Sequence, residues 1–366
     1  MPYIANELLD LLPHVGQVAS SVEFELVTEG VSLPIGRLHP ASDERMSIQN
    51  QTTGNIKRTL RGFYLNAEEA VDINLFRDRI KPFFVLEDGT RWPMGEFLFA
   101  SEDRTETTAG RPLATTLFDQ TSILGNPRPN AFGLDTGEAI VFWIDRMAEE
   151  SGIATARRRT VGNNDIVVND PVSWPSGTPR MRIMNELAEL AGYLTPYFDN
   201  NGILIIRPNP EVRAGPDSMP YDERSPRIFV DSLTRAPNLL DSPNRFIAIN
   251  SGSQQAEIVG VFDVPDHYPQ SIKNRGYEVP KIIRTQGLDS TESAARLAHV
   301  AANQDPSNYE VVQFDSPPDP RHDTFEIVVL NGGEVYIEID WTMDLEPGGT
   351  MRHNLRRSLD TAGGNQ

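Results

Sequence analysis

The chain has 366 residues, no cysteine and a formal net charge of −19 at pH 7, from 33 basic and 52 acidic residues. The lack of cysteine excludes disulfides and thiolate metal sites, and the acidic excess argues against nucleic-acid binding, because phosphates are held by Lys and Arg. No basic segment precedes an apolar stretch at the start and no run of about 18 apolar residues occurs, so we expect neither a signal peptide nor membrane insertion. The length predicts two or three domains.

Alternation of apolar and polar residues predicts strands in the first third of the chain. Residues 22–26 alternate, and residues 83–86 face residues 92–99 across an Asp-Gly turn that is typical of a hairpin. Pro93 has no N–H to donate, so the return strand should begin at a sheet edge or a bulge. A short helix is expected over residues 6–12.

Two helices are predicted in the middle of the chain from their boundary residues. Thr136 is the expected N-cap of a helix that ends at Gly152. Thr178 as N-cap, Pro179 as first residue and Gly192 as the stop define the second helix.

The chain after these helices is expected to form a hairpin and then a linker. Residues 193–208 read as a hairpin that turns at residues 199–202, and the prolines between 208 and 226 predict a linker.

Strands return in the last third, with one helix between them. Residues 246–249 and 257–262 are candidate strands. Asp289 and Glu292 resemble a capping box, which predicts a helix that ends before Pro306.

The longest strand pattern lies near the C-terminus. Apolar and polar residues alternate from Val335 to Leu345, after an Asn-Gly-Gly turn and a partner run at residues 325–330. This pattern predicts a long antiparallel hairpin, with a strand of about 37 Å. Glu338 and Asp340 are expected on its solvent face.

Together these elements predict an α+β, β-rich chain. We place a first β domain with an N-terminal helix at residues 1–125, and an α/β middle domain with a Pro-rich linker at 126–225. A second β domain with one helix follows at 226–355, and residues 356–366 are expected to be a disordered tail.

The histidines do not suggest a metal site, because no two of them have metal-ligand spacing; they are His14, His39, His267, His299, His322 and His353. His322 lies in a Pro-rich loop beside two carboxylates, where a general base is conceivable. A solvated turn residue is the simpler interpretation.

Carboxylate pairs leave a glycoside hydrolase as an alternative. Glu102 with Asp103 and Glu338 with Asp340 are the candidates, although the sequence shows no geometry between them. Residues 199–202 faintly resemble a calcium loop but lack its later ligands, so turn chemistry explains them.

The remaining polar motifs do not indicate catalysis. Arg157, Arg158 and Arg159 form the only basic run, which is too short for a nucleic-acid footprint and reads as a solvated loop. No Gly-x-Ser-x-Gly motif occurs. We therefore predict a protein that is not an enzyme and has no catalytic, cofactor-binding or metal-binding residues.

Three motifs, in this order, resemble the tail-hub (baseplate-hub) minor tail proteins of bacteriophages. Residues 53–58 and then 72–97 contain a strand reaching R-I-x-P, an acidic-Gly hairpin and a P-x-G-x-F return strand. Residues 187–202 are similar to the helix and D-x-x-G hairpin of the family's middle domain. Residues 336–351 look like its closing strand and Gly-Gly turn.

The resemblance implies two tube-like β-barrel domains per chain and a homotrimeric ring that presents six barrels to the hexameric tail tube. It implies a structural hub at the distal end of the tail, which adapts the tube to the tip and leaves an axial channel. The expected partners are a distal tail or tail tube protein, a tail tip or spike protein and, in addition, the tape measure protein, with DNA only in transient passage. The expected location is the virion tail tip, after synthesis in the host cytoplasm.

Two other interpretations stay open at this point. The chain lacks a fused lysozyme-like or peptidase-like domain, yet a tail protein that binds or hydrolyses cell-wall glycans is an alternative. The hub of a related injection machine or gene-transfer particle fits the sequence as well as a phage hub does.

Overall fold

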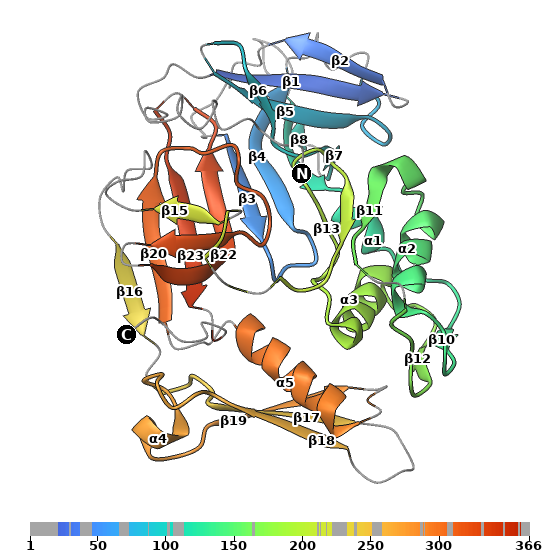
Figure 1. Ribbon diagram of the computed structural model, residues 1–366. Coiled ribbons are helices and arrows are strands. Elements are labelled where there is room, and N and C mark those ends of the chain that lie inside the picture. Colours follow the sequence, from blue (N-terminus) through green and yellow to red (C-terminus); the bar gives the residue numbers. More distant parts are fainter. Residues whose placement is uncertain are drawn as a thin grey trace.

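A large twisted sheet dominates the computed structural model, with a helical unit beside it and a small sheet at one end (Figure 1). The structure describes residues 21–28, 31–36, 46–65, 73–86, 88–100, 103–104, 113–162, 165–210, 212, 214–216, 218–221, 233–237, 240–250, 258–285, 288, 290–305, 310–330, 333–346, 348–357 and 359. The chain is α+β and β-rich, as predicted. No closed barrel is found among the described residues.

The N-terminal part of the large sheet contains the strands β1 (Ser21–Thr28), β2 (Val31–Gly36), β3 (Ser47–Gln51), β4 (Arg58–Leu65), β5 (Arg79–Val85), β6 (Arg91–Pro93), β7 (Phe97–Phe99), β8 (Asp103–Arg104) and β9 (Leu113–Asp119). Strand β5 pairs antiparallel with β1 and, across the predicted hairpin, with β6. Among the described strands β6, which carries Pro93, pairs with β5 alone, so the return strand begins at an edge, as expected from the proline.

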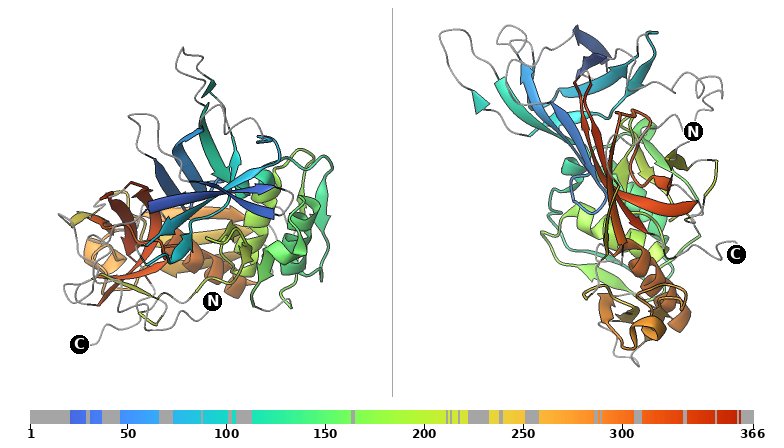
Figure 2. Two further views of the ribbon diagram at one scale, coloured as in Figure 1. Left: turned by 90° about the horizontal axis from the view of Figure 1, so that it is seen from above. Right: turned by 90° about the vertical axis from the view of Figure 1, so that its left-hand side faces the viewer.

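The C-terminal part of the same sheet contains β15 (Met219–Tyr221), β16 (Thr234–Pro237), β20 (Glu310–Ser316), β21 (Ile327–Leu330), β22 (Glu334–Asp344) and β23 (Met351–Arg357). The antiparallel pairing of β21 with β22 is confirmed. Strand β22 also pairs with β3, so strands from opposite ends of the sequence form one sheet of 15 strands. Both views in Figure 2 show these strands side by side.

Part of the predicted linker is instead an ordered strand. Residues 219–221 form β15, which pairs parallel with β21, and the side chain of Tyr221 is fully buried. The sequence does not indicate this strand, because its three residues contain a proline and follow a run of turn-forming residues.

The helical unit contains α1 (Thr121–Leu124), β10 (Phe132–Leu134), α2 (Ile140–Glu150), η2 (Thr155–Arg157), β11 (Arg158–Thr160), β12 (Val172–Trp174), α3 (Arg180–Ala191), β13 (Tyr197–Phe198) and β14 (Leu204–Ile206). The two predicted helices and the hairpin of β13 and β14 are confirmed, although the N-cap position of α3 is Pro179 and not the predicted Thr178. Thr136 does not cap α2, whose N-cap is Ala139; its hydroxyl donates instead to the carbonyl of Asn169. Gly192 ends α3 with a φ of 71°, a conformation that glycine adopts without strain.

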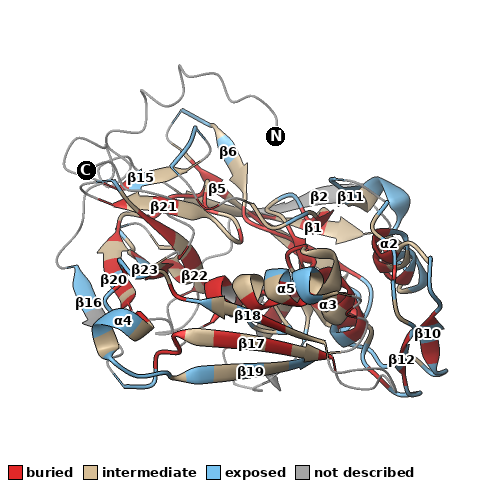
Figure 3. Cartoon of the chain, turned by 60° about the horizontal axis from the view of Figure 1, so that its bottom comes forward, coloured by how far each residue is buried: buried red, intermediate tan, exposed pale blue. Residues whose placement is uncertain are grey.

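The small unit contains β17 (Arg245–Asn250), β18 (Val259–Asp263), α4 (Ile272–Arg275), β19 (Pro280–Thr285) and α5 (Thr291–Gln304). Helix α5 covers one face of the three-stranded sheet (Figure 3). Its capping box is made by Ser290 and Ser293, one residue later than the predicted pair. Gly260 lets α5 approach closely, because a Cβ there would lie 2.1 Å from the backbone nitrogen of Ala295.

Some predictions fall outside the described residues, namely the helix at residues 6–12, Asp289, Glu102 and residues 360–366. Strand β23 continues through Arg357, so ordered chain extends past the predicted boundary at 356. In the described part of the chain, no helix has the length and apolar character needed to cross a membrane. The predicted domain boundaries stay predictions.

Candidate functional site

A buried cluster of ionisable groups lies at the centre of the C-terminal strands. His322, Glu338 and His353 have exposed fractions of 0%, 2% and 0%. The Nδ1 of His322 lies 2.8 Å from one carboxylate oxygen of Glu338, and the Nδ1 of His353 lies 2.6 Å from the other. We call these three residues the His–Glu–His cluster.

Two predictions are wrong here, because His322 is not a solvated turn residue and Glu338 does not lie on a solvent face. For Glu338 the cause is a β-bulge in β22: pairing with β23 moves from Glu338–Leu355 to Asp340–Asn354, so two steps along β22 match one along β23. Side chains alternate between faces with a period of two, so the extra residue reverses the buried face. Tyr336 and Glu338 are buried before the bulge, and Trp341 and Met343 are buried after it.

The outer ring nitrogens of the cluster also have partners. The Nε2 of His322 lies 2.6 Å from the hydroxyl of Tyr221, and the Nε2 of His353 lies 2.9 Å from the hydroxyl of Ser316. The ring of Phe314 stacks on that of His353 at 4.5 Å. The cluster therefore joins β15, β20, β22, β23 and the loop before β21 through satisfied polar contacts.

The electrostatics favour one shared positive charge in the cluster. Burial alone raises a carboxyl pKa, but the two histidines outweigh it and lower the pKa of Glu338 to about 2. Burial lowers the pKa of His322, and the adjacent Glu338 carboxylate outweighs that effect and raises it. At His353, burial and repulsion from His322 outweigh the attraction of Glu338, so the pKa of His353 is lowered. An ionised Glu338 beside one protonated histidine leaves the buried cluster neutral.

The same three residues could form a metal ligand set, because their ligand atoms lie within 4.8 Å of one another. A tetrahedral ion with bonds of about 2.0–2.1 Å holds its ligand atoms about 3.3 Å apart. The observed N–O separations of 2.6 and 2.8 Å are those of hydrogen bonds. In this geometry the three members are hydrogen-bonded, and both separations are shorter than those that a tetrahedral ion would impose.

A second polar network joins the large sheet to the helical unit. Arg58 is 1% exposed, and its guanidinium donates to Asn200 in the β13–β14 turn and to Asp323 and Thr324 in the loop before β21. The side-chain amide of Asn200 also donates to the carbonyl of His322 at 2.9 Å. Buried charge-assisted hydrogen bonds of this kind fix the relative position of the segments that they join.

A third network connects the same two parts and involves the basic run. Arg79 donates to Glu96 at 3.0 Å, and Arg157 donates to the second oxygen of Glu96 and to the carbonyl of Gly202. The prediction that the basic run is a solvated loop is therefore wrong at Arg157, whose partner Glu96 is buried.

Of the predicted hydrolase carboxylates, the structure describes the pair Glu338 and Asp340, whose side chains have different partners. Glu338 belongs to the buried cluster, while Asp340 accepts a hydrogen bond from the side chain of Asn354 on the far side of the bulge. In the turn at residues 199–202, Asp199 accepts from the backbone N–H groups of Asn201 and Ile203, so turn chemistry explains that segment, as predicted.

Comparisons with known proteins identify the fold. No family model and no curated protein matches the sequence. A 43 kDa tail protein of prophage MuSo2 from Shewanella oneidensis superposes with a TM-score of 0.60 and 11% identity, covering 92% of this chain and 98% of that one. A tail protein from Neisseria meningitidis superposes with a TM-score of 0.63 and 10% identity, covering 92% and 96%.

A third similar structure is a component of the type VI secretion system from E. coli, whose own description relates it to tail proteins of bacteriophage T4. It superposes with a TM-score of 0.51 and 8% identity, covering 93% of this chain and 74% of that one. The chain therefore has the fold of phage tail and baseplate-hub proteins, which confirms at the level of fold the resemblance found in the sequence.

Proposed function

We propose that this chain is a structural hub at the distal end of a phage-type tail, where three copies form a ring between the tail tube and the tip. The observation that supports this most strongly is the similarity of fold to tail proteins over nearly the whole of both chains. The polar groups support an architectural role as well, because the His–Glu–His cluster and the Arg58 network connect parts of the fold to one another.

The edges of the large sheet suggest how the ring closes. Along the main path of described strands, the sheet ends at β2 on one side and at β16 on the other. An open strand edge can pair with another chain, and a head-to-tail arrangement of identical copies closes into a ring when the rotation allows it. In this proposal, two tube-like barrel modules per chain are completed in the trimer, which gives six modules to match a hexameric tube.

The charge fits a passage for DNA. A net charge of −19 repels phosphates, so a wall built from this chain would let DNA slide through an axial channel without holding it. We propose a distal tail or tube protein on one side of the ring and a tip or spike protein on the other. The tape measure protein is a further proposed partner, and the virion tail tip is the proposed location.

The oligomeric state is the first test. Three chains of 40.8 kDa give 3 × 40.8, or about 122 kDa. We expect light scattering after gel filtration to give this mass over a range of concentrations. Electron microscopy of tails with a C-terminal label should then place the label at the distal end. A protein that stays monomeric at assembly concentrations, or labels spread along the tube, would contradict the proposal.

A further inference from the structure

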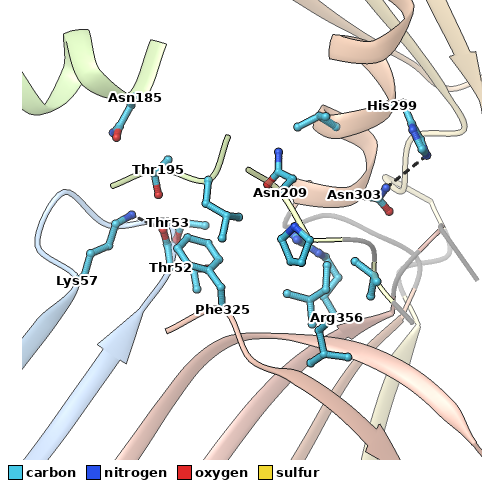
Figure 4. A pocket seen from close by; sticks show the side chains of 16 residues that line it. Thr52, Thr53, Lys57, Asn185, Thr195, Asn209, His299, Asn303, Phe325 and Arg356 are labelled. Atoms are coloured by element: carbon cyan, nitrogen blue, oxygen red, sulfur yellow. Dashed lines mark hydrogen bonds between the residues drawn. The ribbon is translucent and has the colours of Figure 1, made fainter. Parts of the chain in front are cut away.

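A cavity of about 260 Å³ lies where the large sheet, the helical unit and α5 meet. Its wall combines residues from segments far apart in the sequence, with Lys57 near β4, Asn185 on α3 and Arg356 on β23 (Figure 4). It lies on the face of β22 and β23 opposite the His–Glu–His cluster, because Ile337 and Arg356 alternate with the residues that point toward the histidines. At this volume it suits a small ligand rather than a drug-sized one.

Two buried cations line this cavity. Arg356 is 4% exposed, and its Nε and Nη1 find no hydrogen-bond acceptor in the described part of the chain. Lys57 is 1% exposed, and its ammonium group donates to the carbonyl of Thr52. An ammonium group has three N–H donors, so that carbonyl uses one of them.

Two neutral polar groups complete the polar lining. The hydroxyl of Thr195 and the side-chain oxygen of Asn185 are buried and, among the described residues, have no partner. The rest of the wall is largely apolar, with Leu194, Phe325 and Ile337 between the polar groups. In the view of Figure 4, Phe325 lies between Lys57 and Arg356.

Buried donors without acceptors are energetically costly, and a buried guanidinium is more costly than a neutral group. Burial lowers the pKa of Arg356 to about 10, although the negative charge of Asp305 has the opposite effect. Burial also lowers the pKa of Lys57 to about 8, although the negative charge of Asp119 has the opposite effect. Asp305 also forms an ion pair with Lys281 at 2.8 Å, so the negative charge of Asp305 is shared between Lys281 and Arg356. An oxyanion in the cavity would supply the acceptors that the guanidinium lacks.

We propose that this cavity binds a small organic oxyanion, whose charged oxygens accept from Arg356 and Lys57 and whose short apolar body contacts Phe325 and Ile337. Because a ligand there touches all three parts of the fold, its binding would stabilise their arrangement. This proposal does not depend on a place in a tail, since it concerns the folded chain alone.

The test is titration calorimetry of the full-length protein at constant ionic strength with three probes. Adipate supplies two carboxylates on an apolar chain, 1,6-hexanediol supplies the same chain without charge, and inorganic phosphate supplies charge without the chain. We expect saturable binding of adipate, binding of phosphate at least tenfold weaker, and none of the diol. Phosphate binding as tight as adipate binding would overturn the role given to the apolar wall, and equal binding of the diol would overturn the role of the cations.

Two variants test whether adipate binds in this cavity. Arg356→Gln should weaken adipate binding at least tenfold, while Arg352→Gln, an exposed arginine on the same strand, should leave it unchanged. Should Arg356→Gln fail to fold, Val300→Phe tests the same point, because it fills the cavity from α5 without removing a charge. Absence of saturable adipate binding, or adipate binding that survives Val300→Phe, would overturn the proposal.

Discussion

Replacement of Glu338 by Gln removes the charge at the centre of the His–Glu–His cluster and keeps its shape. The pKa of this carboxyl is lowered from 4.5 to about 2, a difference that corresponds to about 3 kcal/mol of stabilisation at neutral pH. Removal of one partner from a buried ion pair costs about 3–5 kcal/mol in other proteins, so the two arguments agree. We expect Glu338→Gln to lower the free energy of unfolding by about 3 kcal/mol at pH 7.

The pH dependence has a definite sign. A carboxyl whose folded pKa is lowered stabilises the protein above its unfolded pKa of 4.5, and this contribution is lost as the pH falls toward 2. At pH 3.5 the difference between wild type and Glu338→Gln should therefore be about 1 kcal/mol smaller than at pH 7. The contribution of His322 has the opposite pH dependence. Its raised pKa stabilises the folded protein below pH 6.5, and this stabilisation is lost as the pH rises through the pKa of His322 in the folded state.

Urea unfolding followed by tryptophan fluorescence at the two pH values measures both effects. Asp340→Asn is the matched control, because this half-buried carboxylate lies two residues further along β22 and its hydrogen bond from Asn354 can be kept. We expect the control to change stability by less than about 1 kcal/mol. A Glu338→Gln variant within about 0.5 kcal/mol of wild type, or a difference that does not shrink at pH 3.5, would refute the account of the cluster.

Three further predictions concern other buried positions. Arg58→Met should cost about 3–5 kcal/mol in urea unfolding, because it removes the cationic partner of the Asp323 carboxylate and the donor to the Asn200 side chain, whereas exposed Arg61→Met on the same strand should be nearly neutral. Gly260→Ala should lower the melting temperature by several degrees, since α5 must move away from the sheet; Val261→Ala, which is exposed, should not. Burial and the nearby charge of Asp323 raise the pKa of Glu326 to about 7, so Glu326→Gln should stabilise the protein by about 1–3 kcal/mol at pH 8 and give no gain at pH 4. Equal effects of paired variants, or a gain at pH 4, would contradict these expectations.

Much of the local structure could be predicted from the sequence. The strand at residues 22–26, the edge position of the strand that carries Pro93, both middle helices and the hairpin at residues 193–208 are all present. These elements can be predicted because they depend on residues close together in the chain. The periodicity of side chains, the positive φ of glycine and the missing N–H of proline each affect only a few neighbouring positions. The caps were less predictable, as Thr136 shows, because a hydroxyl can donate to a distant carbonyl instead of capping its own helix.

The candidate site could not be predicted in the same way. His322 and His353 lie 31 positions apart in a sequence with no metal or catalytic spacing, and the polar–apolar alternation around Glu338 indicated a solvent face. A single extra residue in β22 reversed that face, and the pairing of β22 with β23 that creates the bulge is visible only in three dimensions.

By itself the sequence determined many of the helices and strands, the acidic charge, the exclusion of thiol chemistry and the resemblance to tail-hub proteins, because each is a property of composition or of residues close together in the chain. Only the tertiary structure decided that strands from both ends share one sheet, that two histidines and a glutamate meet in its core, and that Lys57 and Arg356 line one cavity. These facts depend on contacts between residues far apart in sequence, whose burial sets both their charge states and their partners.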